Sequence, residues 1–167
     1  GDTITAVSTA DGGHISHARM GAVGLRGLNL VTYPWNLDRM EPDVDAAAAL
    51  IRESEPSIAL FGQSVFLFPT PLAELSDAAH EVGARVMFDA AHGFGSLYQG
   101  EKVGKAGWCQ VFSLTPTKMV VAGEGGIIAT QDDELAQELR IAREYGNDGS
   151  YDTQFSGLNA RLSELHS

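Results

Sequence analysis

Short apolar runs that alternate with amphipathic helical patterns constrain the fold of this chain more than any other feature of its sequence. Several of the runs are apolar at consecutive positions, as expected for strands that are buried on both faces of a parallel sheet. The predicted strands are residues 3–7, 28–33, 58–61, 85–88, 110–113 and 127–130. Because crossover helices connect parallel strands, the pattern predicts an α/β fold, with a mostly parallel sheet and helices on both of its faces.

Three segments between the predicted strands have the spacing of amphipathic helices. Residues 42–54 begin with Pro42, a residue favoured in the first turn of a helix, and residues 71–82 form the second helix. Residues 132–145 begin with acids, which suit the positive end of a helix dipole. Residues 159–166 have the pattern of a further helix that has only just begun. With 167 residues and no internal repeat or linker, we expect one domain.

Charge and cysteine content exclude several classes of function. The formal net charge of −11 argues against electrostatic binding to nucleic acids and disfavours docking on anionic membranes. No apolar run has the length of a membrane span and no signal-peptide pattern opens the chain, so we expect a cytoplasmic protein. The single cysteine, Cys109, lies in an apolar stretch and is expected to be a buried thiol rather than a nucleophile.

The residues that carry chemistry gather around the ends of two predicted strands. Asp89 and Lys118 each follow a strand, at the edge where open α/β sheets bind their ligands. An aspartate can pair with a protonated pyridine nitrogen, and a desolvated lysine can attack an aldehyde. Hydroxyls of Ser113 and Thr115 could hold a phosphate, and the glycine-rich run 123–126 lets the backbone approach closely. Taken singly, these features also have ordinary explanations as a turn, a helix cap or a solvated lysine.

Residues 86–166 resemble the DegT/StrS-type nucleotide-sugar aminotransferases, which are pyridoxal-phosphate (PLP) enzymes of fold-type I. The matching stretches read FDAAHGFGSLYQGEKVG, VFSLTPTKMVVAGEGGIIATQDDELAQELRIAREYGNDG and FSGLNARLSEL. The resemblance implies that Asp89 binds the pyridine nitrogen, and that Lys118 forms the Schiff base with PLP and shuttles the proton. It also implies that Ser113 contacts the phosphate, and that Asn159 reaches the phosphate of a neighbouring protomer in a homodimer with shared sites.

Residues 1–92 resemble serine hydroxymethyltransferase and its relatives, which share this fold. The segments GDTI, GGHISH, GQSVFLFP and DAAH carry the resemblance. It implies that His14 stacks on the pyridine ring and that Ser64 and His92 lie near the phenolic oxygen of PLP. Two positions depart from that family: Thr117 replaces a histidine before the Schiff-base lysine, and residues 66–68 replace its Tyr-x-Arg.

The other histidines have no role in either resemblance. His17 is expected to be structural or exposed, and His80 and His166 are expected on the surface. The Gly-Gly-His segment itself also fits an ordinary turn with a solvated histidine. No grouping of His, Asp or Glu has the spacing of a metal site, so no metal is expected.

Together the two resemblances imply a PLP-dependent aminotransferase, which acts on a keto-sugar nucleotide with an amino-acid donor. One alternative is a lyase similar to serine hydroxymethyltransferase or threonine aldolase, and another is a non-catalytic fragment or regulatory module of the same fold. A natural intermediate, a recombined gene and an engineered chimera would all produce this combination. We expect residues 1–167 to be a partial PLP-binding large domain without its N-terminal segment and small C-terminal domain, and therefore with weak or no turnover alone.

Overall fold

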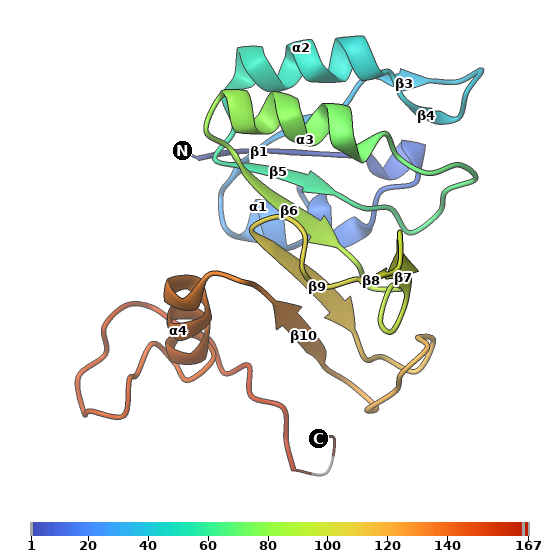
Figure 1. Ribbon diagram of the computed structural model, residues 1–167. Coiled ribbons are helices and arrows are strands. Elements are labelled where there is room, and N and C mark those ends of the chain that lie inside the picture. The colour runs from blue at the N-terminus through green and yellow to red at the C-terminus, as the bar shows by residue number, and fades with distance from the viewer. Residues whose placement is uncertain (1, 165, 167) are drawn as a thin grey trace. The chain divides into compact units, whose positions relative to one another are not determined.

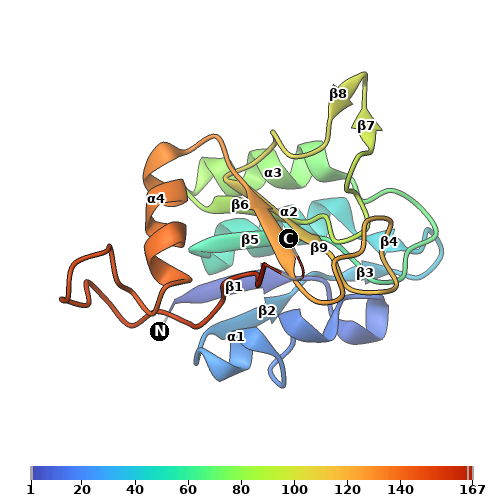
Figure 2. The same cartoon turned by 90° about the horizontal axis from the view of Figure 1, so that it is seen from below.

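A computed structural model describes residues 2–164 and 166 of the chain. The chain divides into two compact units, Gly1–Asp89 and Ala90–Ser167 (Figures 1 and 2). The two units are described separately below. No helix among the described residues is both long and apolar enough to cross a bilayer.

The first unit is built on parallel strands in the order β6-β5-β1-β2. These strands are β1 (Thr3–Ala6), β2 (Asn29–Thr32), β5 (Ile58–Phe61) and β6 (Arg85–Asp89). Helices α2 (Val44–Ser54) and α3 (Leu72–Glu81) lie side by side on one face, and the short helix α1 (Ala22–Leu25) lies on the other (Figure 1). Parallel pairing and helices on both faces are therefore confirmed for this unit.

A hydrophobic core on each face holds the first unit together. On the side of α2 and α3, Phe61 is 1% exposed and its ring stacks on Tyr33 with centroids 5.5 Å apart. The Tyr33 and Thr5 hydroxyls are hydrogen-bonded at 2.9 Å, and burial raises the pKa of Tyr33 above its ordinary value. On the opposite side, Val23 of α1 packs with apolar residues of β1 and β5. Burial on both faces explains why these strands are apolar at consecutive positions.

The predicted start of the first helix was wrong by two residues. Pro42 belongs to the short strand β4 (Glu41–Pro42), which pairs antiparallel with β3 (Trp35–Asn36). The N-cap of α2 is Asp43, whose side chain accepts a hydrogen bond from the Ala46 backbone N–H at 3.0 Å. A carboxylate satisfies one of the unpaired amides at the helix start, which proline cannot do, and so it sets the boundary.

The second unit contains an antiparallel strand pair and one long helix. Strand β9 (Cys109–Ser113) pairs with β10 (Gly126–Ala129), and a small hairpin joins β7 (Leu97–Tyr98) to β8 (Glu101–Lys102). Helix α4 (Asp133–Ala142) is capped by Asp132, which accepts a hydrogen bond from the Leu135 N–H. Acids at the start of this helix were predicted, and the cap confirms their role.

The helix predicted for residues 159–166 is wrong over the described residues 159–164, which contain no helix. The backbone here bonds to the end of α4 instead of to its own preceding turn. The Leu158 N–H donates to the Ala142 carbonyl at 2.7 Å, and the Ala160 N–H donates to the Arg143 carbonyl at 3.0 Å. Non-local pairing therefore overrides the helical spacing of the sequence.

Cys109 is buried at the start of β9, as predicted, and forms no disulfide. Burial raises the pKa of its thiol, so less thiolate is present at pH 8 than for an exposed cysteine. We expect a disulfide reagent to modify the folded protein at least about tenfold more slowly than the unfolded protein at pH 8. Stopped-flow absorbance with and without denaturant measures both rates, and equal rates would contradict the burial of Cys109.

Candidate active site

Two loops of the first unit meet beyond the carboxyl ends of β1 and β5. The Gly12 carbonyl accepts hydrogen bonds from the Ser64 N–H at 2.9 Å and from the Val65 N–H at 3.2 Å. Gly12 has φ of +97°, and a Cβ there would lie 2.1 Å from the Val65 carbonyl oxygen, so only glycine permits this approach. The contact brings together the segments that carry His14 and Ser64, and both of these side chains are exposed.

Asp89 ends β6 at the same edge of the first unit, since the carboxyl ends of parallel strands share one edge. Its carboxylate oxygen Oδ2 lies 2.9 Å from His17 Nε2, and the two side chains are 18% and 7% exposed. Gly62 follows β5 and passes so close to Asp89 that a Cβ on Gly62 would lie 2.6 Å from the Asp89 Cβ. The imidazole therefore contacts the carboxylate itself, while the Gly62 backbone packs against the Cβ and main chain of Asp89.

His17 was expected to be structural or exposed, and the structure places it in direct contact with Asp89. It ends the 3-10 helix η2 (Ile15–His17), whose N-cap is His14. The Nδ1 atom of His14 accepts a hydrogen bond from the Ser16 N–H at 3.2 Å, and the His17 N–H donates to the His14 carbonyl. One short turn thus places one histidine at the surface and the other beside the carboxylate. No local sequence pattern identifies His17 as the partner of Asp89, because the contact joins residues far apart in the chain.

Lys118 and His92 lie together in the second unit. Lys118 Nζ is 2.8 Å from His92 Nε2. A turn after β9 presents the lysine, since the Lys118 N–H donates to the Thr115 carbonyl at 3.0 Å. A second turn presents the histidine, since the Gly93 N–H donates to the Ala90 carbonyl. The Lys118 side chain is half-buried and that of His92 is exposed.

The predicted phosphate ligands are only partly brought together. Ser113 Oγ and Thr115 Oγ1 are 3.1 Å apart, at the end of β9 and on the turn that leads to Lys118. Asn159 is exposed and pairs with Glu144 in an isolated bridge. Among the described residues no hydrogen bond joins Asn159 to Ser113, Thr115 or Lys118. Its expected contact with the cofactor of a neighbouring protomer stays a prediction.

Apart from Asn159, the candidate residues thus lie at strand ends and in the loops after them in each unit, and their donor chemistry fits PLP. The first unit offers a carboxylate for a protonated pyridine nitrogen, and the Gly62 backbone leaves no space for a side chain beside it. The second unit offers an amine for the cofactor aldehyde and paired hydroxyls for a phosphate. No group of three His, Cys, Asp or Glu side chains among the described residues could hold a metal ion.

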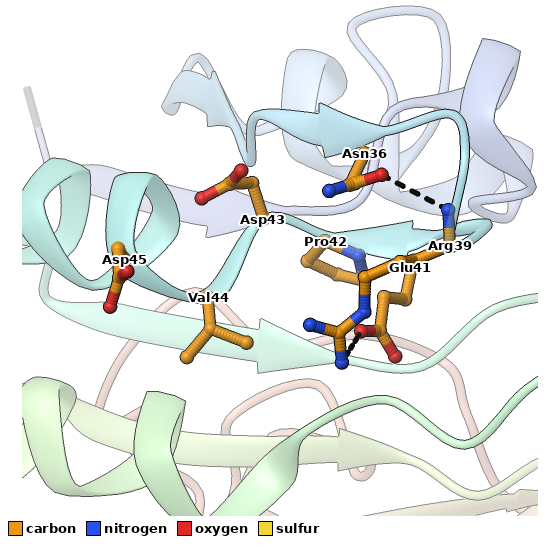
Figure 3. Close-up of a pocket in the computed structure, with 7 residues that line it drawn as sticks. All are labelled: Asn36, Arg39, Glu41, Pro42, Asp43, Val44 and Asp45. Atoms are coloured by element: carbon orange, nitrogen blue, oxygen red, sulfur yellow. Dashed lines mark hydrogen bonds and ion pairs between the residues drawn. The ribbon is translucent and has the colours of Figure 1, made fainter.

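Two surface depressions contain none of these candidates. The first, about 100 Å³, lies between β3, β4 and the start of α2 (Figure 3). Here the Arg39 guanidinium is paired with Glu41 at 2.5 Å, and the Arg39 backbone N–H donates to Asn36 Oδ1. The second, about 250 Å³, lies beside the end of α4. The candidate site is therefore defined by strand ends and the loops after them rather than by either depression.

Known proteins resemble this chain in sequence and in structure. It is 40% identical over 146 residues to a serine hydroxymethyltransferase of Pyrococcus furiosus, and the match spans 85% of this chain and 34% of that protein. The corresponding enzyme of Picrophilus torridus is 50% identical over 101 residues, which span 60% of this chain and 23% of that protein. The chain thus spans about a third or less of the curated relatives it matches.

Several of the solved structures that resemble this chain are aminotransferases. S. venezuelae DesV, solved in complex with a ketimine intermediate, superposes with a TM-score of 0.79 at 27% identity, over 99% of this chain and 43% of DesV. DesI, solved in the presence of its TDP-sugar product, gives a TM-score of 0.77 at 29% identity, over 99% of this chain and 40% of DesI. These neighbours confirm the fold-type I assignment, which is the fold of PLP-dependent aminotransferases.

A family model extends the match upstream of the stretch where the motifs had indicated it. The resemblance to sugar aminotransferases was read from residues 86–166, whereas the family model matches residues 18–167. This match includes Ser64 and Asp89 of the first unit as well as Lys118 of the second. The chain therefore belongs to the DegT/DnrJ/EryC1/StrS aminotransferase family.

Proposed function

We propose that the protein works as a PLP-dependent aminotransferase that moves an amino group from an amino acid to a keto-sugar nucleotide. One observation carries the proposal: Lys118 Nζ lies 2.8 Å from His92 Nε2, on the segment that follows β9. The chain also belongs to an aminotransferase family. The sugar nucleotide is proposed because DesI, at 29% identity, was solved with a TDP-sugar product. Because the chain spans 43% of DesV, the activity is proposed for the assembled enzyme.

Four residues would supply the chemistry of the proposed reaction. PLP, when bound, supplies the electron sink that stabilises a developing carbanion. Lys118 would hold the cofactor covalently and then carry the proton at Nζ between the two reacting carbons. His92 lies within hydrogen-bond distance of that nitrogen and would keep it in place. Asp89 would hold the proton on the pyridine nitrogen, and His14 would lie against the ring.

The remaining candidates would bind and orient the cofactor. Ser113 and Thr115 would hold the phosphate through their hydroxyls, and Ser64 would lie near the phenolic oxygen. Asn159 would reach the phosphate of a neighbouring protomer, so a homodimer with shared sites belongs to the proposal. Residues 1–167 would supply part of the PLP-binding large domain. A cytoplasmic location also stays a prediction.

A second candidate function is the cleavage of β-hydroxy amino acids. It is favoured by 40% identity over 146 residues to the Pyrococcus furiosus serine hydroxymethyltransferase. The Gly12 contact also joins the two segments that resemble that family. Both reactions begin at a lysine-bound cofactor, so Lys118 does not distinguish them.

Parallel assays of the PLP-loaded assembled enzyme distinguish the two reactions. We expect keto acid to form from L-glutamate when a TDP-keto-sugar is present, and L-threonine to release acetaldehyde at least about tenfold more slowly, since each site stabilises one transition state. Coupled-enzyme absorbance measures both products, with the Lys118→Ala protein as the background control. Faster acetaldehyde release would favour the lyase. A covalently bound cofactor with neither product would favour a non-catalytic module.

A further inference from the structure

The buried histidine beside Asp89 is unexplained by the roles proposed above. We propose that His17 is a positioning residue, which acts through Asp89 by fixing the orientation of its carboxylate and keeping it ionised for the pyridine nitrogen of PLP. This inference rests on the proposed function, because a carboxylate needs this control only if it meets a cofactor. Neither family resemblance assigned a role to His17; its position in the fold indicates one.

The contact has the geometry of a charge-assisted hydrogen bond. His17 Nε2 lies 2.9 Å from Asp89 Oδ2, and the His17 side chain is only 7% exposed. A bond to one carboxylate oxygen restricts rotation of the whole group and therefore sets the direction of the other oxygen. Because water is largely excluded from His17, the bond is stronger than it would be on the surface.

The surrounding backbone holds the imidazole in place. The His17 N–H donates to the His14 carbonyl at 3.0 Å, and the Ala18 N–H donates to the Ile15 carbonyl at 3.1 Å. Gly21 packs so tightly on this turn that a Cβ there would lie 2.2 Å from the Ile15 carbonyl oxygen. A side chain on such a constrained turn has little freedom to leave Asp89.

The two ring nitrogens of His17 have different surroundings, which identify the proton position. Nε2 faces a carboxylate and so carries a hydrogen, whereas Nδ1 is buried without a hydrogen-bond partner among the described residues. The bond to Asp89 therefore runs from the Nε2–H of His17 to the carboxylate oxygen. A donor at this position orients the Asp89 carboxylate and leaves its second oxygen for the pyridinium. The ring of His14 also lies near that of His17, with centroids 6.0 Å apart.

Nuclear magnetic resonance of the cofactor-free protein tests the pair directly. In protein with ¹⁵N-labelled histidine, we expect His17 to show a hydrogen on Nε2 that is bonded to the Asp89 carboxylate. The Asp89→Asn variant should change that signal and leave the signal of exposed His80 unchanged. A His17 signal that is the same in both proteins would overturn the proposed contact, whatever the cofactor does.

Cofactor affinity tests the consequence of the pair. The His17→Phe variant keeps the ring volume but removes the donor, and we expect PLP to bind about tenfold to a hundredfold more weakly, as is typical for loss of a hydrogen bond to a charged group. His17→Gln keeps an N–H at the same reach and should recover most of the affinity. His80→Gln is the control, because His80 is exposed on α3.

These outcomes separate the inference from the proposed function. If the wild-type protein forms no covalent adduct with PLP, the proposed function fails, and the resonance of His17 still tests the contact. If the adduct forms and His17→Phe binds PLP as tightly as the wild type, the positioning role is overturned while the proposed function stands. Similar circular-dichroism melting of all three histidine variants shows that weaker binding is not a folding defect.

Discussion

The Lys118→Ala variant is expected to lose covalent attachment of PLP completely. In the wild-type protein, PLP should give the visible absorption band of a protonated Schiff base, and borohydride should fix the label on Lys118. The physical reason is the environment of this amine: Lys118 is half-buried, and its Nζ lies 2.8 Å from an imidazole nitrogen. The turn after β9 holds this amine beside His92, and alanine removes the nucleophile altogether.

The chain offers a clean internal control for this experiment. Its only other lysines are Lys102 and Lys105, and both are exposed. Lys105 Nζ is paired with Glu101 at 2.9 Å, and this pair lowers the pKa of the Glu101 carboxyl. We therefore expect Lys105→Ala to keep the band and the labelled peptide. Mass mapping would contradict the assignment of Lys118 if the label were spread over Lys102 and Lys105, or if the band survived in Lys118→Ala.

The strands that carry the site could be predicted because buried strands have apolar residues at consecutive positions. Strand β5 was predicted with the bounds that the structure has, since every residue of Ile58–Phe61 is apolar. Asp89 and Lys118 could be singled out because ligands of α/β sheets bind beyond strand ends. The boundary at Pro42 was wrong because a side chain, that of Asp43, decides where the helix begins.

The contacts that organise the site could not be predicted because they join residues far apart in the sequence. His17 meets Asp89, and the Gly12 carbonyl meets the loop after β5, through pairings that no local pattern encodes. The helix expected at residues 159–166 was wrong for the same reason, since pairing with the end of α4 takes its place. A local pattern reports burial and turn chemistry, whereas the partner of a buried polar group depends on the whole fold.

The Phe61→Ala variant is expected to be the most destabilising substitution on the α2 and α3 side of the first unit. Phe61 is 1% exposed, and its ring lies 5.5 Å from that of Tyr33 and 6.1 Å from that of Phe88. Removing a buried aromatic ring loses its transfer free energy and leaves a cavity, so the free energy of unfolding should fall by about 3–5 kcal/mol. Denaturant titration followed by circular dichroism measures the change.

The control for this variant is Phe68→Ala, because Phe68 is 53% exposed in the loop after β5 and should lose less than about 1 kcal/mol. Equal losses in the two variants would contradict the position of Phe61 in the core. The substitution should also affect the candidate site. Phe61 directly precedes Gly62, whose backbone passes close to Asp89. A cavity at Phe61 lets this strand end relax, so PLP should bind more weakly to Phe61→Ala even under conditions where the variant is fully folded. The packing of this core therefore also determines where the Asp89 carboxylate lies.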